Sequence, residues 1–324
     1  MRALERTVTV RDKRLLLRVE TSHDPEDYRM YEALREEIWA FPEDHLAGTR
    51  NMMCENIFHE GASLFIGAFT EGPGGGFKVD GEHLVGFCYG FVGVRDKAVG
   101  FRDPGNLRFY AQYAGVRTDY QSYGLGIELK VFQREMVLDL LGVSTVICTY
   151  DPLTGVNAHR NIHHFGMDVL EYRVATYGEY GGLLNRLDVP TDRFLMSWDL
   201  LRKAVRPDYD FDAALAAPQP IIVGLRGVEG KNSRLELEVV ERTDANVPGD
   251  ILLVRIPLDF YRILQETDVA DRGVRRIAVD WRLAGREVFR TLFARGFRVI
   301  DFRKAEGQGS GNYYVMSRPA ASSR

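Results

Sequence analysis

The sequence predicts a mixed α/β fold in which strands and helices alternate along the chain. Two observations lead to this prediction. Short apolar runs of strand type recur throughout the 324 residues, and several longer segments carry apolar residues at helical spacing. Up to residue 200 the order is strand, helix, several strands, helix, strand, helix and two strands. This order is typical of helices packed on a mixed sheet.

The first helix follows a short strand at residues 14–20. Ser22 or Asp24 can cap this helix, Pro25 suits its first turn, and acidic residues come next. Apolar residues then recur at helical spacing as far as Trp39. Further strands are expected at residues 62–70, 83–94 and 106–117.

A long helix is expected at residues 127–141, followed by a buried strand at 144–150. The helix carries apolar stripes on two opposite sides, so we expect neighbours on both sides. A short helix at 155–167 ends at Gly166, because glycine readily adopts the left-handed conformation that closes a helix. Two more strands, DVLEYRVATYG and RFLMSWDL, complete this part of the chain.

A polar segment rich in Pro and Ala at residues 201–220 interrupts the periodicity. We therefore expect two domains, at residues 1–204 and 205–324. The second domain contains further strand-like runs, among them RRIAVDW, and a helix in RLAGREVFRTLFARGF.

The second domain contains a faint repeat of the first. VICTYDPLTGVNAHRNIHHFGM and IAVDWRLAGREVFRTLFARGF share a strand, a helix and a closing glycine, and FLMSW and YYVMS follow as matching strands. Gly155 and Gly166 fall opposite Gly285 and Gly296 without a gap. We interpret the second domain as a degenerate, non-catalytic copy of part of the first. Chance similarity of two such segments is the alternative.

Composition and charge exclude several classes of protein. The net charge of −4 provides no general basic field for nucleic acid or for an anionic membrane. No segment approaches the roughly 20 apolar residues of a membrane span, and the N-terminus does not read as a secretory signal. The three cysteines are widely spaced, as buried thiols of a reducing compartment would be. We expect a cytoplasmic monomer or homodimer.

The stretch DYQSYGLGIELK, residues 119–130, places Gln121, Gly124 and Gly126 between a strand and a helix. At a helix start several backbone N–H groups lack an intrahelical partner, and glycines let an anion approach them. The loop matches neither the Rossmann fingerprint nor the P-loop. We predict that it binds a phosphate group, with a plain flexible turn as the alternative.

This loop and the segment NAHRNIHHFGM resemble the GNAT superfamily of acyl-CoA N-acyltransferases. That superfamily has a mixed, mostly antiparallel sheet flanked by helices, and a Q/R-x-x-G-x-G/A loop after its fourth strand. The resemblance implies binding of coenzyme A, as acetyl-CoA or another acyl-CoA. It implies pantetheine contacts at Gly115, Val116 and Arg117 and a further cofactor contact at Asn157. It also implies that backbone N–H groups hold the pyrophosphate at Gln121, Ser122, Tyr123, Gly124, Leu125, Gly126 and Ile127.

The segment TYDPLTGVNAHRNIHHFGM looks like a narrower branch with a D-P-L…N-A-x-x-N-I-H signature. Members of that branch have been linked to N-acylation of amino acids, including N-succinylation. The resemblance therefore implies transfer of an acetyl or other short acyl group to the amine of a small molecule, by direct attack in a ternary complex. Two alternatives are a CoA-binding sensor or scaffold that has lost transfer, and a protein or peptide N-acetyltransferase.

The usual general acid of the superfamily is missing. Where many members carry a tyrosine, four residues before the closing glycine, this sequence has Ile162. His163 is the nearest titratable replacement, and Tyr150 and Asp151 end the strand that opens toward the thioester in this fold. Each also has a structural explanation, in helix capping, core packing or turn formation. His159 and His163 have metal-ligand spacing without an accompanying Glu, so we expect no metal.

Overall fold

The computed structural model describes residues 3–39, 62–121, 123–178, 181–307 and 310–318. The chain forms two compact units. The first unit comprises the chain up to Cys148 together with Asp199–Leu201, and the second comprises Thr149–Trp198 together with the chain from Arg202 onward. The division therefore falls inside a strand, and not near residue 204, where the composition changes.

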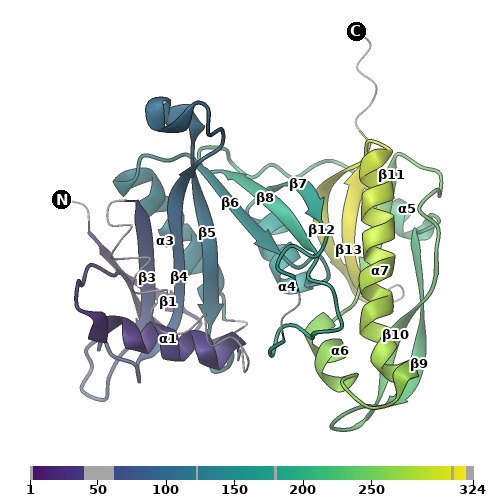
Figure 1. Cartoon of the computed structure of the whole chain (residues 1–324), viewed down its shortest axis with the longest axis horizontal. Helices are drawn as coiled ribbons and strands as arrows, with labels where there is room; N and C mark the ends of the chain where they lie inside the picture. The colour runs from purple at the N-terminus through teal and green to yellow at the C-terminus, as the bar shows by residue number, and fades with distance from the viewer. Residues whose placement is uncertain (1–2, 40–61, 122, 179–180, 308–309, 319–324) are drawn as a thin grey trace. The chain divides into compact units, whose positions relative to one another are not determined.

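The first unit contains a mixed, mostly antiparallel sheet, which confirms the expected fold class (Figure 1). The first five strands pair antiparallel in chain order, and the fifth pairs with the sixth in parallel. A parallel pair needs a crossover connection, which the helix between these two strands supplies. The strands are β1 (Glu5–Val10), β2 (Lys13–Val19), β3 (Ser63–Thr70), β4 (Leu84–Val94), β5 (Leu107–Val116) and β6 (Thr145–Tyr150).

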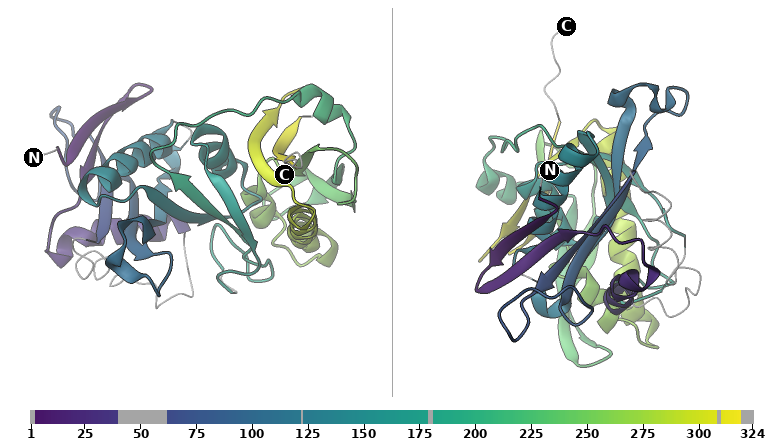
Figure 2. Two further views of the ribbon diagram at one scale, coloured as in Figure 1. Left: turned by 90° about the horizontal axis from the view of Figure 1, so that it is seen from above. Right: turned by 90° about the vertical axis from the view of Figure 1, so that its left-hand side faces the viewer.

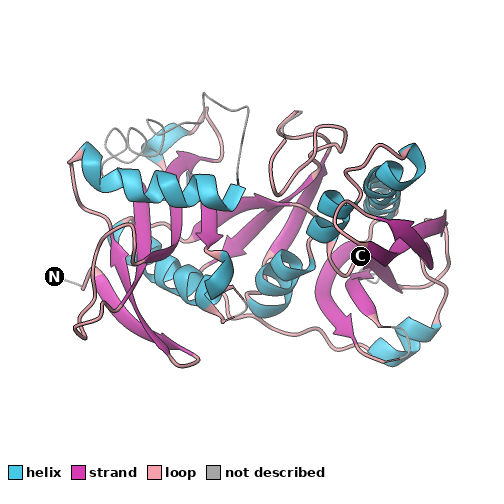
Figure 3. Cartoon of the chain, turned by 90° about the horizontal axis from the view of Figure 1, so that it is seen from below, coloured by secondary structure: helices cyan, strands magenta, loops and turns pink. Residues whose placement is uncertain are grey.

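Two helices cover the two faces of this sheet, α1 (Pro25–Trp39) and α3 (Leu125–Leu140) (Figures 2 and 3). Glycines on neighbouring strands show which helix covers which face. A Cβ on Gly115 would lie 2.7 Å from an α1 side chain, whereas one on Gly86 would lie 3.3 Å from an α3 side chain. Because both faces are covered, β3 and much of β4 are buried, and their sequences read as continuous apolar runs.

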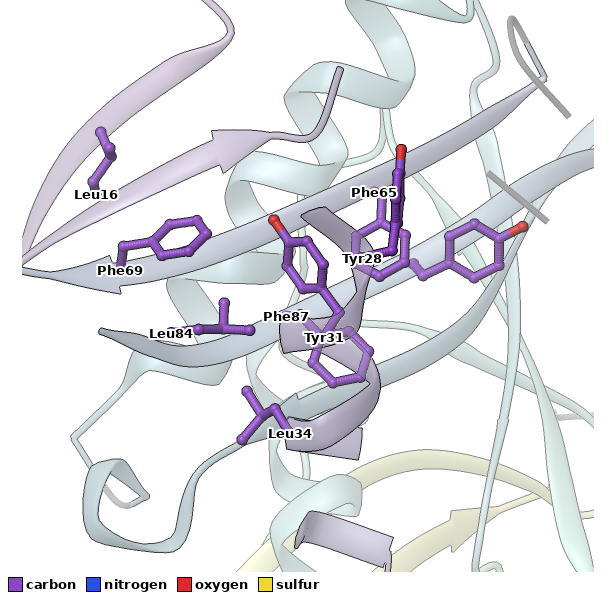
Figure 4. Close-up of a cluster of buried hydrophobic side chains, with 9 residues drawn as sticks. Leu16, Tyr28, Tyr31, Leu34, Phe65, Phe69, Leu84 and Phe87 are labelled. Carbon is purple, nitrogen blue, oxygen red and sulfur yellow. The ribbon is translucent and has the colours of Figure 1, made fainter. Parts of the chain in front are cut away.

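Aromatic side chains hold α1 on the sheet (Figure 4). Tyr31 packs on Phe65 of β3 with ring centroids 4.6 Å apart, and Phe65 stacks on Phe87 of β4 at 5.8 Å. Tyr28 approaches Phe65 edge-on at 6.0 Å. Aromatic side chains bury about 150–250 Å² each. This cluster is therefore a main source of the free energy that fixes α1.

Helix α3 is buried on one broad face. Leu129 and Met136 are buried, whereas Leu140, from the same predicted stripe, is exposed. Ile127 and Val131, from the opposite stripe, are half-buried. The prediction that α3 is buried on two sides is thus confirmed for most of the stripe that contains Leu129, and only partly for the stripe that contains Ile127.

The second unit contains antiparallel strands in smaller sets (Figure 1). β7 pairs with β8, β9 pairs with β10, and a three-stranded sheet has the order β11-β13-β12. The strands are β7 (Asp168–Arg173), β8 (Arg193–Asp199), β9 (Ile221–Glu229), β10 (Arg234–Thr243), β11 (Ile251–Ile256), β12 (Arg298–Ala305) and β13 (Gly311–Ser317). The helices are α4 (Gly155–Ala158), the π-helix η4 (His159–His164), α5 (Phe211–Ala216), α6 (Phe260–Glu266) and α7 (Arg272–Ala294).

Contacts within the second unit explain why it includes residues from before position 204. Both η4 and β7 pack against β12, and α7 packs against β7. Residues 149–198 therefore share a core with the C-terminal segment. That the domains 1–204 and 205–324 are separate functional parts stays a prediction.

The prediction of one strand in the second unit is wrong. RRIAVDW, residues 275–281, lies within α7. Apolar residues continue at helical spacing through it, so that Ile277 and Trp281 are buried, and Asp271 caps the helix by accepting a hydrogen bond from Val274 N. The β-branched residues of this segment suggest a strand, but the longer amphipathic period prevails. Neither α7 nor any other helix of the described residues is both long and apolar enough to cross a bilayer.

The predicted repeat is confirmed for its helix, its glycine and its two following strands. Gly166 and Gly296 both adopt positive φ, at +63° and +86°, after a helix. The strand after each glycine pairs antiparallel with the next strand and bulges at the same position, at Leu170 in β7 and Ile300 in β12. A bulge at matching positions is a specific feature and favours a true duplication over chance.

Gly90 of β4 lies opposite a bulge in β5. The ladder shifts register between Tyr89 and Gly90, which makes Gln112 of β5 an extra residue. A Cβ on Gly90 would lie 2.4 Å from the Phe109 ring and from the Tyr110 carbonyl oxygen. Glycine therefore allows the two strands to approach closely at the bulge.

We predict that Gly90→Ala lowers the free energy of unfolding by about 1–3 kcal/mol, because the added methyl group overpacks this contact. Gly93→Ala is the matched control, since it lies on the same strand and its added Cβ would have no neighbour within 4 Å. Chemical denaturation measures the difference. Equal stability of the two variants would contradict the close packing at the bulge.

Candidate functional site

The bulge in β5 coincides with the point where β5 leaves its parallel neighbour. Among the described residues, β5 and β6 pair only at Phe109 with Val146 and at Tyr110 with Ile147. β5 nevertheless continues to pair with β4 to its last residue. The edge of β5 from residue 111 onward is therefore open on one side, where its backbone groups can bond a ligand as they would a further strand.

The alternation of an antiparallel ladder decides which groups face this open edge. Arg117 N donates to the Val85 carbonyl oxygen at 2.9 Å, so Arg117 of the β5 end and Val85 of β4 form a hydrogen-bonded pair of the ladder. Hydrogen-bonded and non-hydrogen-bonded pairs alternate, and Val116 and Ala114 therefore direct their N–H and C=O groups away from β4. Of Gly115, Val116 and Arg117, only Val116 has its backbone groups on the open edge. Ala114 joins it as an exposed residue that the sequence analysis missed.

A loop with free N–H groups follows the open edge. The short 3-10 helix η3 (Thr118–Tyr120) leads toward Gly124, which precedes α3 with φ +93°. The N–H groups of Gly124, Leu125 and Gly126 have no hydrogen-bond partner among the described residues, whereas Ile127 N donates to the Gly124 carbonyl oxygen at 2.8 Å. The glycine-containing end of the loop thus offers several donors at the positive end of the helix dipole.

The other predicted loop residues have different surroundings. Gln121 Nε2 donates to the Val116 carbonyl oxygen at 3.0 Å, and Gln121 N donates to the Thr118 carbonyl oxygen at 3.2 Å. Gln121 therefore closes the loop onto the end of β5. Tyr123 is half-buried. Ser122 lies outside the described residues.

Basic side chains surround this loop. Lys13 Nζ lies 4.2 Å from the centre of the Tyr120 ring, and the Arg11 guanidinium lies 4.3 Å from that of Tyr123. Arg117 lies 5.4 Å from the Tyr120 ring centre. In a chain of net charge −4, these cations produce a local positive field beside the free N–H groups.

Asp151 is buried in an ion pair of the second unit. Its carboxylate accepts two hydrogen bonds from Arg282, one of them at 2.8 Å, and a third from Leu153 N at 2.9 Å. Arg193 lies 3.5 Å from the same carboxylate. Burial raises the pKa of Asp151, but Arg282, Arg193 and the Leu153 N–H together hold it below its ordinary value. These contacts explain Asp151 structurally, and a role toward substrate stays a prediction.

Tyr150 is also buried in the second unit. Its hydroxyl lies 3.0 Å from the Tyr314 hydroxyl, which donates to the Pro152 carbonyl oxygen at 2.7 Å. Because Tyr314 uses its proton on Pro152, Tyr150 is the donor in the bond between the two tyrosines. Burial raises the pKa of Tyr314 well above its ordinary value. The Tyr150 proton is thus engaged within the unit, and its donation to a leaving thiolate stays a prediction.

His163 lies in the π-helix η4 and contacts a buried carboxylate. His163 Nδ1 lies 2.8 Å from Asp301 Oδ1, and the Tyr209 hydroxyl donates to Asp301 Oδ2 at 2.7 Å. The ring of His159 lies 4.9 Å from that of His163. Burial, and then the neighbouring His163, lower the pKa of His159. Ile162, at the position where the sequence analysis expected the tyrosine, is buried and apolar. A role of His163 in proton transfer stays a prediction.

Asn157 has local partners. Its Nδ2 donates to Thr154 Oγ1 at 3.2 Å, and its Oδ1 accepts from Arg160 at 2.6 Å. Its predicted contact with a cofactor stays a prediction. Within the described ranges no group of three or more His, Cys, Asp or Glu is arranged to hold a metal ion.

Glu32 of α1 was missed by the sequence analysis. It is only 5% exposed, and its Oε1 has no hydrogen-bond partner among the described residues. Burial raises the pKa of Glu32 to about 7, against the opposing effects of Arg35 and Arg29. Its position could have revealed it, because Glu32 lies one helical turn after Tyr28 on the buried side of α1, which also carries Arg35.

No family model matches this sequence, and no curated protein is found to be similar to it. Solved acetyltransferase structures are similar to part of the chain. NAA60 from Arabidopsis thaliana, in complex with acetyl-CoA, is 14% identical over 57% of this chain and 97% of its own, with a TM-score of 0.42. The ribosomal-protein-S18-alanine N-acetyltransferase from Escherichia coli is 12% identical over 60% of this chain and 99% of its own, with a TM-score of 0.40.

A GNAT-family acetyltransferase from Streptococcus pneumoniae is 14% identical over 56% of this chain and 97% of its own, with a TM-score of 0.40. Identities of this size concern the fold alone.

We predict that Arg282→Leu lowers the free energy of unfolding by about 3–5 kcal/mol, because it leaves the Asp151 carboxylate buried without its main partner. Arg276→Leu, on the same helix, breaks an exposed pair with Asp280 at 2.9 Å and is expected to cost about 0.3–0.5 kcal/mol. Urea denaturation of the full chain measures both. A small effect of Arg282→Leu, similar to that of the control, would disprove the buried pair.

Proposed function

We propose that this protein is an acyl-CoA-dependent N-acyltransferase. It transfers an acetyl, succinyl or other short acyl group to the amine of a small molecule such as an amino acid. The proposal is supported chiefly by one observation: an open strand edge on β5 runs directly into a loop with free N–H groups and surrounding cations. An acyl-CoA has the complementary parts in the same order, a thioester, an amide-containing pantetheine arm and a diphosphate.

The open edge suits the pantetheine arm. Its amides can bond to Ala114 and Val116 by addition to the strand edge, which provides main-chain hydrogen bonds without requiring particular side chains. Because Val116 O already accepts a bond from Gln121 at 3.0 Å, Gln121 either shares this oxygen or moves aside. A carbonyl oxygen has two lone pairs and can accept both hydrogen bonds.

The loop suits the diphosphate. The free N–H groups of Gly124, Leu125 and Gly126 form an anion site at the start of α3. Gly124 also presents no Cβ toward the ligand, and its positive φ is readily adopted only by glycine. Arg11, in the turn between β1 and β2, and Lys13, the first residue of β2, add positive charge.

His163 is the candidate for proton transfer in this proposal. Asp301 orients the imidazole by contacting Nδ1, which leaves Nε2 to transfer the proton. Asp301 is itself held by Tyr209. Since Asp301 and Tyr209 belong to residues 205–324, this assignment gives the C-terminal segment a positioning role, in place of the non-catalytic role expected from the sequence.

Arg117 is a candidate partner for a succinyl carboxylate. Its guanidinium already pairs with Asp119 at 3.0 Å. A succinyl group would therefore compete with Asp119, whereas an acetyl group would leave this pair intact.

We predict that Val116→Pro lowers the affinity for acetyl-CoA at least tenfold, because proline removes an N–H from the open edge without breaking a bond to β4. Val116→Ala keeps the N–H and is the matched control, with an expected affinity close to that of the parent. Calorimetric titration measures both, and thermal unfolding confirms that each variant folds. Unchanged binding by Val116→Pro would remove the open edge from the proposed site.

Thiol release from acetyl-CoA and succinyl-CoA tests the reaction itself. The acceptors are amino acids, a diamine, a polyamine and a short peptide with a free N-terminus. We predict release with at least one small amine. Binding of acyl-CoA without release for any acceptor would favour a sensor, and release with the peptide alone would favour a peptide acyltransferase. Absence of acyl-CoA binding at millimolar concentration would exclude the proposed function.

A further inference from the structure

Glu32 lies on the face of α1 that is turned toward the sheet. Tyr28, one turn earlier, contacts Phe65 of β3 with ring centroids 6.0 Å apart. Trp39, two turns later, contacts Tyr113 of β5 at 5.9 Å. Residues at these spacings share one helix stripe. The stripe therefore crosses the sheet from β3 to β5, and Glu32 lies within it above the central strands.

Glu32 Oε1 and Gln112 Oε1 are buried oxygen atoms that have no hydrogen-bond partner among the described residues. Gln112 is the extra residue of the bulge, where it and Tyr113 together oppose Tyr89. Tyr89 belongs to the aromatic cluster under α1. Gln112 therefore lies in the part of β5 where the open edge begins.

Both of these atoms are hydrogen-bond acceptors, so the missing group is a donor. A buried carboxylate oxygen without a hydrogen-bond donor is unfavourable, because it has lost its water, and the charges of Arg35 and Arg29 offset this penalty only in part. Protonation of the carboxyl relieves this penalty, and so does a bound group with several N–H donors. A primary ammonium carries three such donors and a compensating positive charge.

We propose that Glu32 binds the protonated primary amine of the acceptor and takes its proton, with Gln112 as a second acceptor for the amine. This inference rests on the proposed function and names the acceptor class: a primary alkylammonium. The site belongs to the same unit as the open edge of β5.

The step balances as follows. The Glu32 carboxylate accepts one proton from the ammonium, which leaves a neutral amine and a carboxylic acid. The amine nitrogen forms a bond to the thioester carbonyl carbon as the carbon–sulfur bond breaks. The second proton of the amine replaces the lost bond at sulfur. The products are an amide and the free thiol of CoA, and Glu32 later returns its proton to water.

The electrostatic surroundings of Glu32 agree with this role. Burial raises the pKa of the Glu32 carboxyl to about 7, while Arg35 and Arg29 on the same helix oppose the shift. Tyr89 and Tyr113 are titratable side chains of the strands packed against α1, and Glu20, directly after β2, accepts a hydrogen bond from the Tyr31 hydroxyl of α1 at 3.0 Å. A carboxyl that titrates near neutral pH can both accept and release a proton during turnover.

Glu32→Gln tests the proton transfer, with Glu36→Gln as the matched control at an exposed position one turn later. Benzylamine is protonated at neutral pH, whereas aniline is neutral and needs no deprotonation before attack. We predict that Glu32→Gln lowers kcat/KM for benzylamine by about 10²–10⁴-fold and for aniline by less than about tenfold. Acetyl-CoA affinity, measured by calorimetry, stays unchanged. Equal losses for the two amines indicate a structural role and overturn the inference.

Amine binding is also measured without any thioester. Benzylammonium chloride is expected to raise the melting temperature of the parent and of Glu36→Gln, relative to sodium chloride, but not that of Glu32→Gln. Equal shifts in all three proteins, or no shift in any, overturn the role of Glu32 whatever the acyl-CoA result. If the parent binds benzylammonium through Glu32 but binds no acyl-CoA, the proposed function fails while the amine site stands.

Discussion

The ladder between β4 and β5 is the interaction on which the candidate site depends. β4 pairs with β5 along the whole length of that strand. β5 therefore stays a strand beyond the bulge, where its opposite edge no longer pairs with β6. Unpaired backbone groups are tolerated only where water or a ligand reaches them. An open edge at the end of a central strand, continued by free N–H groups at the start of α3, therefore offers backbone groups to which a chain-like ligand can bond.

A second constraint acts within the second unit, where buried charges require buried partners. Asp151 pairs with Arg282, and Asp192 pairs with Arg286 at 2.8 Å. In each pair the acid comes from before residue 204 and the arginine from α7. Because a buried charge that loses its partner is strongly destabilising, these pairs commit residues 149–198 to fold with the C-terminal segment. This explains why the compact units and the composition suggest different boundaries.

Much of the fold follows from local pattern. The apolar runs at 62–70 and 83–94 become β3 and β4, and the glycine at 166 ends its helix with positive φ as expected. The loop before α3 was also correctly placed, since glycine spacing is a local property. The strand expected at 275–281 was wrong because a short apolar run does not distinguish a strand from one turn of a longer buried helix.

The sequence by itself determined the position of the loop and the strands of the first unit other than β1, which it missed, because these depend on neighbours within a few residues. It also suggested the class of ligand. Only the tertiary structure decided which backbone groups of β5 face its open edge and that His163 contacts Asp301. It also decided that Glu32 is buried with one oxygen atom that has no hydrogen-bond partner among the described residues. Strand register and side-chain burial depend on pairing between segments far apart in the chain. No local pattern carries that information, and so the chemistry of the site became visible only once the chain was folded.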